Sequence, residues 1–119
     1  MAWTQILCDG QADCPGRVIL NLADGHSNLV VYSENDGALR TFPCSVPALV
    51  GVQRGTRTHL ASEAGECVLS KEADGIHITV HPRGEDENTF LFFIPSDDYL
   101  IGLTKLVEAK AVQRRVSLQ

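Results

Sequence analysis

The 119-residue chain has little positive charge, few aromatic side chains and no long hydrophobic run. Ten Lys and Arg stand against fifteen Asp and Glu, which gives a formal net charge of −5. Because electrostatic affinity for nucleic acid depends on clustered Lys and Arg, this balance disfavours non-specific binding to polyanions. No apolar stretch approaches the ~18 residues that a membrane-spanning helix needs, so we expect no association with a membrane.

The amino terminus lacks the features of a secretory signal. The stretch "MAWTQILCDG" has neither a basic segment nor an apolar segment of the required length. We therefore expect a cytoplasmic protein, in a compartment that keeps thiols reduced. With 44% hydrophobic residues, one domain spanning residues 1–119 can bury a core without a disulfide or a metal ion.

Common catalytic motifs are also missing. The chain contains no Gly-x-Ser-x-Gly, no P-loop and no His-Glu-x-x-His. We predict that the protein is not an enzyme and that it carries no cofactor.

Short apolar segments separated by turn residues predict a β-rich protein. Asp24-Gly25 and Asp74-Gly75 are typical of turns, because both residue types tolerate positive φ. The segments expected as strands are 18–22, 29–32, 38–42, 67–70, 76–80 and 89–94. The last of them, "TFLFFI", is apolar on both faces, which is typical of the centre of a sheet.

Two segments have the signals of helices. The first, 45–52, begins with Ser45 as an N-cap and has Pro47 in its first turn. The second, 97–115, follows Pro95 and Ser96 and has acidic residues early and basic residues late, as the helix dipole favours. The polar stretch 53–66 between the two halves reads as a linker.

Three short matches recur in the same order in both halves of the chain. Ala23-Asp24-Gly25 matches Ala73-Asp74-Gly75, Thr41-Phe42 matches Thr89-Phe90, and "ALVGV" at 48–52 matches "YLIGL" at 99–103. The offsets stay near fifty residues, which indicates a tandem repeat with units of about 17–54 and 65–115. We predict an α+β fold of antiparallel β-meanders, each followed by a helix, in a ββββα arrangement that occurs twice.

This order of elements resembles the tandem sheet-then-helix repeats of the Pur and Whirly families, a fold also used by SsgA-like division proteins. The residues that carry the resemblance are "GIHITVHPRGEDENTFLFFIPSDDYLIGLTKLV" and, less strongly, "NLVVYSENDGALRTFPCSVPALVGV". The Pur and Whirly resemblance implies binding of single-stranded nucleic acid through basic and aromatic side chains. The SsgA-like resemblance implies protein contacts, which suit an acidic domain with few Lys or Arg on its strands.

The expected strand 76–80, together with the next residue, carries polar side chains on one of its faces. His77, Thr79 and His81 alternate with Ile76, Ile78 and Val80, so they share a face. Four residues along a strand span ~13 Å, so the two histidines cannot share one metal ion. They form either a solvated face or a surface for a partner, and histidine titrates near neutral pH.

A compact basic loop contains Arg54, Arg57 and His59. It is either a solvated connection or a contact for an anion or phosphate group, for which Arg and Thr supply suitable donors. Its residues and those of the His77 strand are the predicted partner-binding or nucleic-acid-binding residues.

Cys8 and Cys14 are the candidate metal ligands. Five residues separate them, whereas zinc knuckles usually separate paired cysteines by two to four. A second pair, Cys44 and Cys67, would have to lie close by to complete a structural zinc site. The alternatives are a disulfide or redox pair, and a loop with two ordinary cysteines.

The sequence thus favours a non-enzymatic adaptor domain that acts through protein–protein contacts and forms a homo-oligomer by pairing of edge strands. A single-stranded nucleic-acid-binding module and a small metal- or thiol-dependent regulator remain as alternatives.

Overall fold

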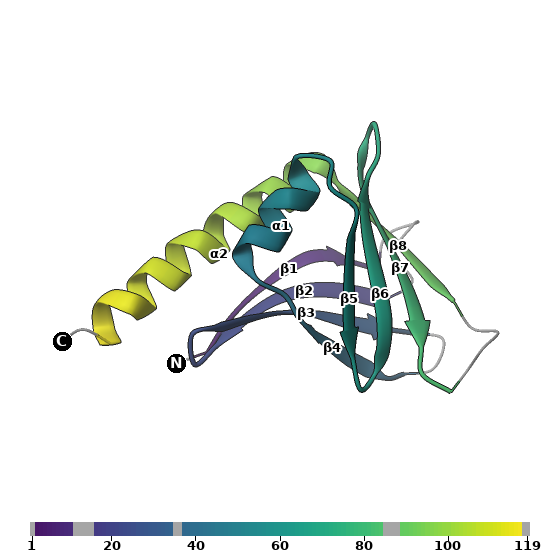
Figure 1. Cartoon of the computed structure of the whole chain (residues 1–119), viewed down its shortest axis with the longest axis horizontal. Coiled ribbons are helices and arrows are strands. Elements are labelled where there is room, and N and C mark those ends of the chain that lie inside the picture. The colour runs from purple at the N-terminus through teal and green to yellow at the C-terminus, as the bar shows by residue number, and fades with distance from the viewer. Residues whose placement is uncertain (1, 11–15, 35–36, 85–88, 118–119) are drawn as a thin grey trace.

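Two four-stranded antiparallel sheets, each followed in the chain by one helix, make up the protein (Figure 1). The computed structural model describes residues 2–10, 16–34, 37–84 and 89–117. The N-terminal sheet contains β1 (Ala2–Asp9), β2 (Gly16–Ala23), β3 (His26–Ser33) and β4 (Leu39–Pro43), and α1 (Val46–Gln53) follows it. The C-terminal sheet contains β5 (Thr58–Ser62), β6 (Gly65–Lys71), β7 (Gly75–Pro82) and β8 (Phe90–Pro95), and α2 (Ser96–Ser117) follows it. The predicted α+β class with two ββββα units is confirmed.

The three sequence matches fall at equivalent places in the two units. Asp24-Gly25 makes the turn from β2 to β3, and Asp74-Gly75 lies at the turn from β6 to β7. Phe42 and Phe90 lie in the last strand of their respective sheets, and the third match lies in α1 and α2. At the first turn Asp24 has φ of 53° and Gly25 has φ of 79°, which is the conformation that favours this dipeptide.

Two expectations about strands were wrong. The predicted linker 53–66 contains β5 and the turn into β6. The sequence did not indicate this strand because β5 is short and only its Leu60 is buried, so it lacks a regular apolar alternation. The segment "TFLFFI" forms β8, which lies at an edge of its sheet and not at the centre. Its inner residues enter the core, whereas Leu91 on the other side is 65% exposed.

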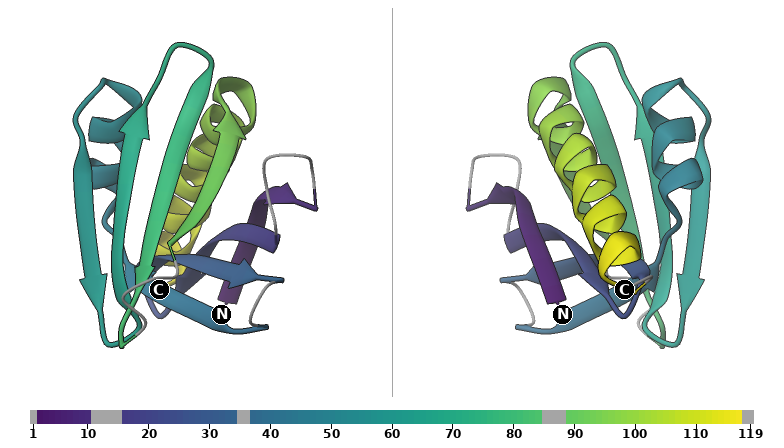
Figure 2. Two further views of the ribbon diagram at one scale, coloured as in Figure 1. Left: turned by 90° about the vertical axis from the view of Figure 1, so that its right-hand side faces the viewer. Right: turned by 90° about the vertical axis from the view of Figure 1, so that its left-hand side faces the viewer.

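Both helices lie between the two sheets, on their inner faces (Figures 1 and 2). Helix α2 contacts β1 and β2 of one sheet and β7 and β8 of the other. At Gly102 it comes so close to β1 that an added Cβ would lie 2.2 Å from the Leu7 side chain. No helix in the described ranges is long and apolar enough to cross a membrane.

Side-chain hydrogen bonds hold both ends of α1. The Ser45 hydroxyl accepts a hydrogen bond from the Ala48 amide at 3.2 Å, which confirms the predicted N-cap. Lys71 of β6 donates its ammonium to the Gln53 carbonyl at 2.8 Å, at the other end of the helix. This second bond ties the first unit to the second.

Two further contacts join the units through the core. The Tyr99 hydroxyl of α2 donates to the Leu49 carbonyl of α1 at 2.5 Å, and both residues are fully buried. Arg40 of β4 is 8% exposed, and its guanidinium lies 5.2 Å from the centre of the Phe90 ring in β8. The two sheets therefore share one core.

The contact between Tyr99 and Leu49 gives a first prediction. Tyr99→Phe should lower the free energy of unfolding by about 1–2 kcal/mol, because it leaves a buried carbonyl without its donor. Urea unfolding followed by circular dichroism measures the change. Tyr32→Phe, on an outer strand position, is the control, and an equal loss in both variants would contradict the role given to Tyr99.

The buried thiols give a second prediction. Burial raises the pKa of Cys44 from its ordinary value of 9.0 to about 11. Burial and the neighbouring Cys44 raise the pKa of Cys67 to about 12. The folded state thus holds both protons more tightly than the unfolded chain does. The stability that the two protonated thiols contribute is fully present below pH 9 and is lost as the pH rises toward 11–12.

Urea unfolding between pH 8 and pH 10 should therefore show a falling free energy of unfolding, by about 1.4 kcal/mol per pH unit for each thiol above pH 9. The double variant Cys44→Ala, Cys67→Ala should lose less stability over this range. Parallel curves for the two proteins would show that other groups cause the loss.

Candidate interaction surface

The outer face of the C-terminal sheet is the surface on which four of the six predicted partner-binding residues lie. Antiparallel register places His59 of β5 opposite Val68 of β6, and Val68 opposite Thr79 of β7. Because paired residues point to the same side of a sheet, the three share one face. The outer positions of this sheet are His59, Ala61, Glu66, Val68, Ser70, His77, Thr79, His81, Leu91 and Phe93. The left view of Figure 2 looks onto this face, and no helix lies in front of it.

Four of the six predicted partner-binding residues therefore lie together. His77, Thr79 and His81 share a face, as their alternation predicted, with both histidines exposed and Thr79 half-buried. His59, which the sequence placed in a linker, joins them because β5 pairs with β6. Only the strand pairing could reveal this, since His59 and His77 are far apart in the chain.

Contacts within the sheet hold two of these histidines. The His77 ring packs edge-on against the Phe93 ring, with centroids 5.1 Å apart and planes at 72°. The His81 Nδ1 lies 3.2 Å from the Thr89 hydroxyl. Phe93 of β8 thus positions the His77 ring, and Thr89, just before β8, positions the His81 ring.

The exposed apolar side chains of the same face lie at its β8 edge, which the sequence did not predict. Val68 is opposite Thr79, and Thr79 is opposite Leu91, so they form one row across three strands. Phe93 lies in the next row, beside His77. The signal was present in "TFLFFI", but an apolar strand of this kind suggested a central position and two covered faces.

The other two predicted residues, Arg54 and Arg57, are exposed and lie apart from the strand pairing. Arg54 follows the end of α1, and its backbone amide donates to the Val50 and Gly51 carbonyls at 3.1 Å. Arg57 lies in the short connection before β5. The loop is a helix-to-strand connection that exposes two positive charges.

The candidate metal ligands do not form a cluster in the part of the chain that the structure describes. Cys8 is buried in β1 and is disulfide-bonded, which contradicts the expectation of reduced thiols and leaves its sulfur unavailable as a thiolate ligand of a metal ion. Cys14 lies outside the described residues. Cys44 and Cys67 are free thiols in the core. Within the described ranges, no three His, Cys, Asp or Glu side chains come together in a way that could hold a metal ion.

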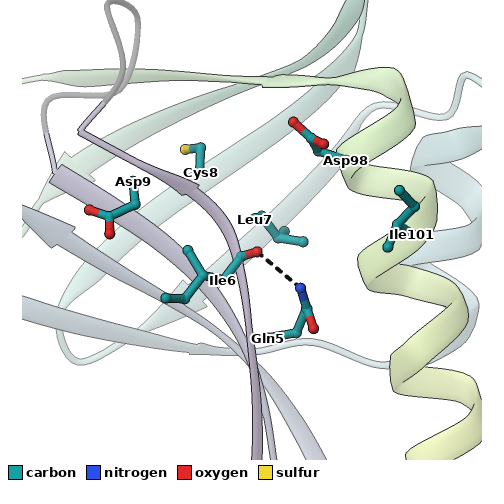
Figure 3. Close-up of a pocket in the computed structure, with 7 residues that line it drawn as sticks. All are labelled: Gln5, Ile6, Leu7, Cys8, Asp9, Asp98 and Ile101. Atoms are coloured by element: carbon teal, nitrogen blue, oxygen red, sulfur yellow. Dashed lines mark hydrogen bonds between the residues drawn. The ribbon is translucent and has the colours of Figure 1, made fainter.

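A shallow groove of about 240 Å³ lies between β1 and the first turns of α2 (Figure 3). Polar side chains that line the groove already make hydrogen bonds within the protein. The Gln5 amide donates to the Ile6 carbonyl at 3.3 Å, and the Asp9 carboxylate accepts from Arg17 at 2.9 Å. Asp98 lies in the first turn of α2, where the helix dipole stabilises its charge. The groove therefore does not bring a nucleophile and a base together.

Comparisons with known proteins add no identity, since no protein-family model, no curated protein and no solved structure matches the chain. The resemblance to Pur, Whirly and SsgA-like proteins stays a prediction.

Burial of the free thiols gives a third prediction, which addresses the thiol-dependent alternative. Cys44 and Cys67 should resist iodoacetamide in the native protein, because the reactive species is the thiolate and both groups are buried with raised pKa values. Peptide mass mapping after alkylation, with and without urea, measures the protection. Rapid modification of either residue without urea would support an accessible, reactive thiol.

Proposed function

We propose that the protein is a non-enzymatic binding domain that docks a protein partner on the outer face of its C-terminal sheet. The observation that carries this proposal is β8, an edge strand that exposes Leu91 by 65% and leaves Phe93 half-buried. An apolar edge of this kind loses its contact with water when a partner covers it, and the histidines beside it supply hydrogen-bonding groups at its rim.

The side chains on this face favour a protein over a nucleic acid. None of the outer positions named above for β5 to β8 is Lys or Arg, and Glu66 adds a negative charge. Binding of single-stranded nucleic acid relies on a positive groove together with stacking aromatics. Here one aromatic side chain, Phe93, is present without the positive charge.

The arrangement of the histidines favours binding over catalysis. They are distributed over β5 and β7, and His77 and His81 are four residues apart on one strand, a separation of ~13 Å. General acid–base chemistry needs groups within hydrogen-bond reach of one reacting atom. The resemblance of residues 75–107 to SsgA-like proteins, which act through protein contacts, agrees with a binding role.

Two matched variants test the proposal. Leu91→Glu places a charge on the proposed docking face, and Leu39→Glu places the same charge on the other sheet at a side chain of similar exposure, 67%. The wild type and both variants are used to capture proteins from a lysate of the host organism. A candidate retained by the wild type and lost with Leu91→Glu is then purified, and its affinity for each variant is measured in solution.

We expect Leu91→Glu to weaken binding by about tenfold or more, because a carboxylate would have to be desolvated in the contact. Leu39→Glu should leave the affinity for a soluble partner unchanged. The double variant His77→Ala, His81→Ala should weaken binding less than Leu91→Glu does, because both histidines lie at the rim of the proposed contact. Equal losses in the two Glu variants, or binding of a fluorescent single-stranded oligonucleotide at low salt, would overturn the proposal.

A further inference from the structure

A second apolar face lies on the N-terminal sheet, away from the surface proposed above. In the register of β1 to β3, Ile6 is opposite Ile19, and Ile19 is opposite Val30. In the adjacent row Tyr32 is opposite Leu39. Ile6 is 50% exposed and Leu39 67% exposed, and the other three are half-buried.

The core and the helices lie on the opposite side of this sheet. The inward neighbours of these residues along the strands, such as Leu20 and Val31, are fully buried or nearly so. Helix α2 approaches on that inner side, where Gly102 lies against Leu7 and Leu20. Figure 3 shows the division at β1, with Leu7 directed toward α2 and Ile6 directed away from it.

The outer face of the N-terminal sheet carries no net formal charge among its described residues, although the chain as a whole carries −5. Its outer positions are Thr4, Ile6, Asp9, Arg17, Ile19, Asn21, Ala23, His26, Asn28, Val30, Tyr32, Leu39, Thr41 and Pro43. Asp9 and Arg17 neutralise each other through a contact of 2.9 Å near one end. Two copies of an acidic chain repel each other least when such a face lies between them.

The polar residues on this face also suit contact with an identical surface. Asn28 donates to Asn21 across the strand pair at 3.4 Å. Each amide carries both donors and an acceptor, so the same two side chains can bond to their copies across a two-fold axis. The outer face of the C-terminal sheet lacks this property, because none of its outer positions named above is Asn or Gln.

The size of the face is sufficient for a reversible dimer. Three strands of eight residues and one of five, ~4.8 Å apart and rising ~3.3 Å per residue, cover about 460 Å². Two such faces would bury about 900 Å², in the range of weak and transient protein interfaces. A dimer of this size should form in a concentration-dependent manner.

We propose that the outer face of the N-terminal sheet is a homodimer interface, occupied by a second copy of the same chain through face-to-face sheet packing. The interface differs from the edge-strand pairing expected from the sequence. It does not depend on the proposed function, because it uses the other sheet. Dimerisation would also give the assembly two copies of the docking face on the C-terminal sheet.

Sedimentation velocity of the full chain from about 1 to 500 µM tests the interface, across the range in which a weak dimer forms. The wild type should pass from the 12.9 kDa monomer to a species of twice that mass. Leu39→Glu should raise the dimer dissociation constant about tenfold or more, whereas Leu91→Glu should leave it unchanged. Added salt should leave the dimer intact or tighten it, because it screens the repulsion between two acidic chains.

Circular dichroism confirms that the variants are folded, and Thr41→Glu, at an exposed outer position that ends the Ile6 row, supplies a second disruption of the face. A wild type that stays monomeric throughout the range overturns the proposal. Loss of the dimer with Leu91→Glu, or a dimer that tolerates both Leu39→Glu and Thr41→Glu, overturns it as well. Because affinity for a soluble partner is measured separately, failure of the dimer interface leaves the proposed function standing.

Discussion

The register of the strands is the constraint on which the rest of this structure depends. In the C-terminal sheet it aligns one buried side chain from each strand into a row, Leu60, Cys67, Val80 and Phe90. A shift of one residue would turn each of these side chains outward and bring outer residues such as Glu66 and His81 into the core. The composition of the outer face is therefore a direct consequence of the packing of the inner face.

The two units share an order of elements but differ in what their helices do. Helix α1 has eight residues, and α2 has 22 and contacts both sheets. Gly102 allows α2 to lie close to β1, and the Tyr99 hydroxyl joins it to α1. The second helix thereby closes a core to which both units contribute, which is why neither sheet needs another layer on its inner side.

Both sheets carry exposed apolar side chains on their outer faces, and the two proposed surfaces rest on them. A sheet that faces water on one side usually alternates apolar and polar residues. Here Leu91 and Leu39 occupy outer positions of the two sheets with similar exposure. The histidines beside Leu91 favour a different partner there, whereas the neutral face around Leu39 favours a second copy of the chain. The two surfaces would let one small domain dimerise and bind at the same time.

The sequence predicted both helices, six of the strands and the repetition of the units, because turn dipeptides, the Ser45 cap and the charges at the ends of α2 act locally. It predicted that His77, Thr79 and His81 share a face, since alternation along one strand needs no other strand. It did not reveal β5, whose short polar sequence is held by pairing, or the edge position of β8. Only the tertiary structure placed His59 on the same sheet face as the β7 histidines and left Leu91 and Leu39 uncovered, because exposure depends on which strands pair and where the helices pack.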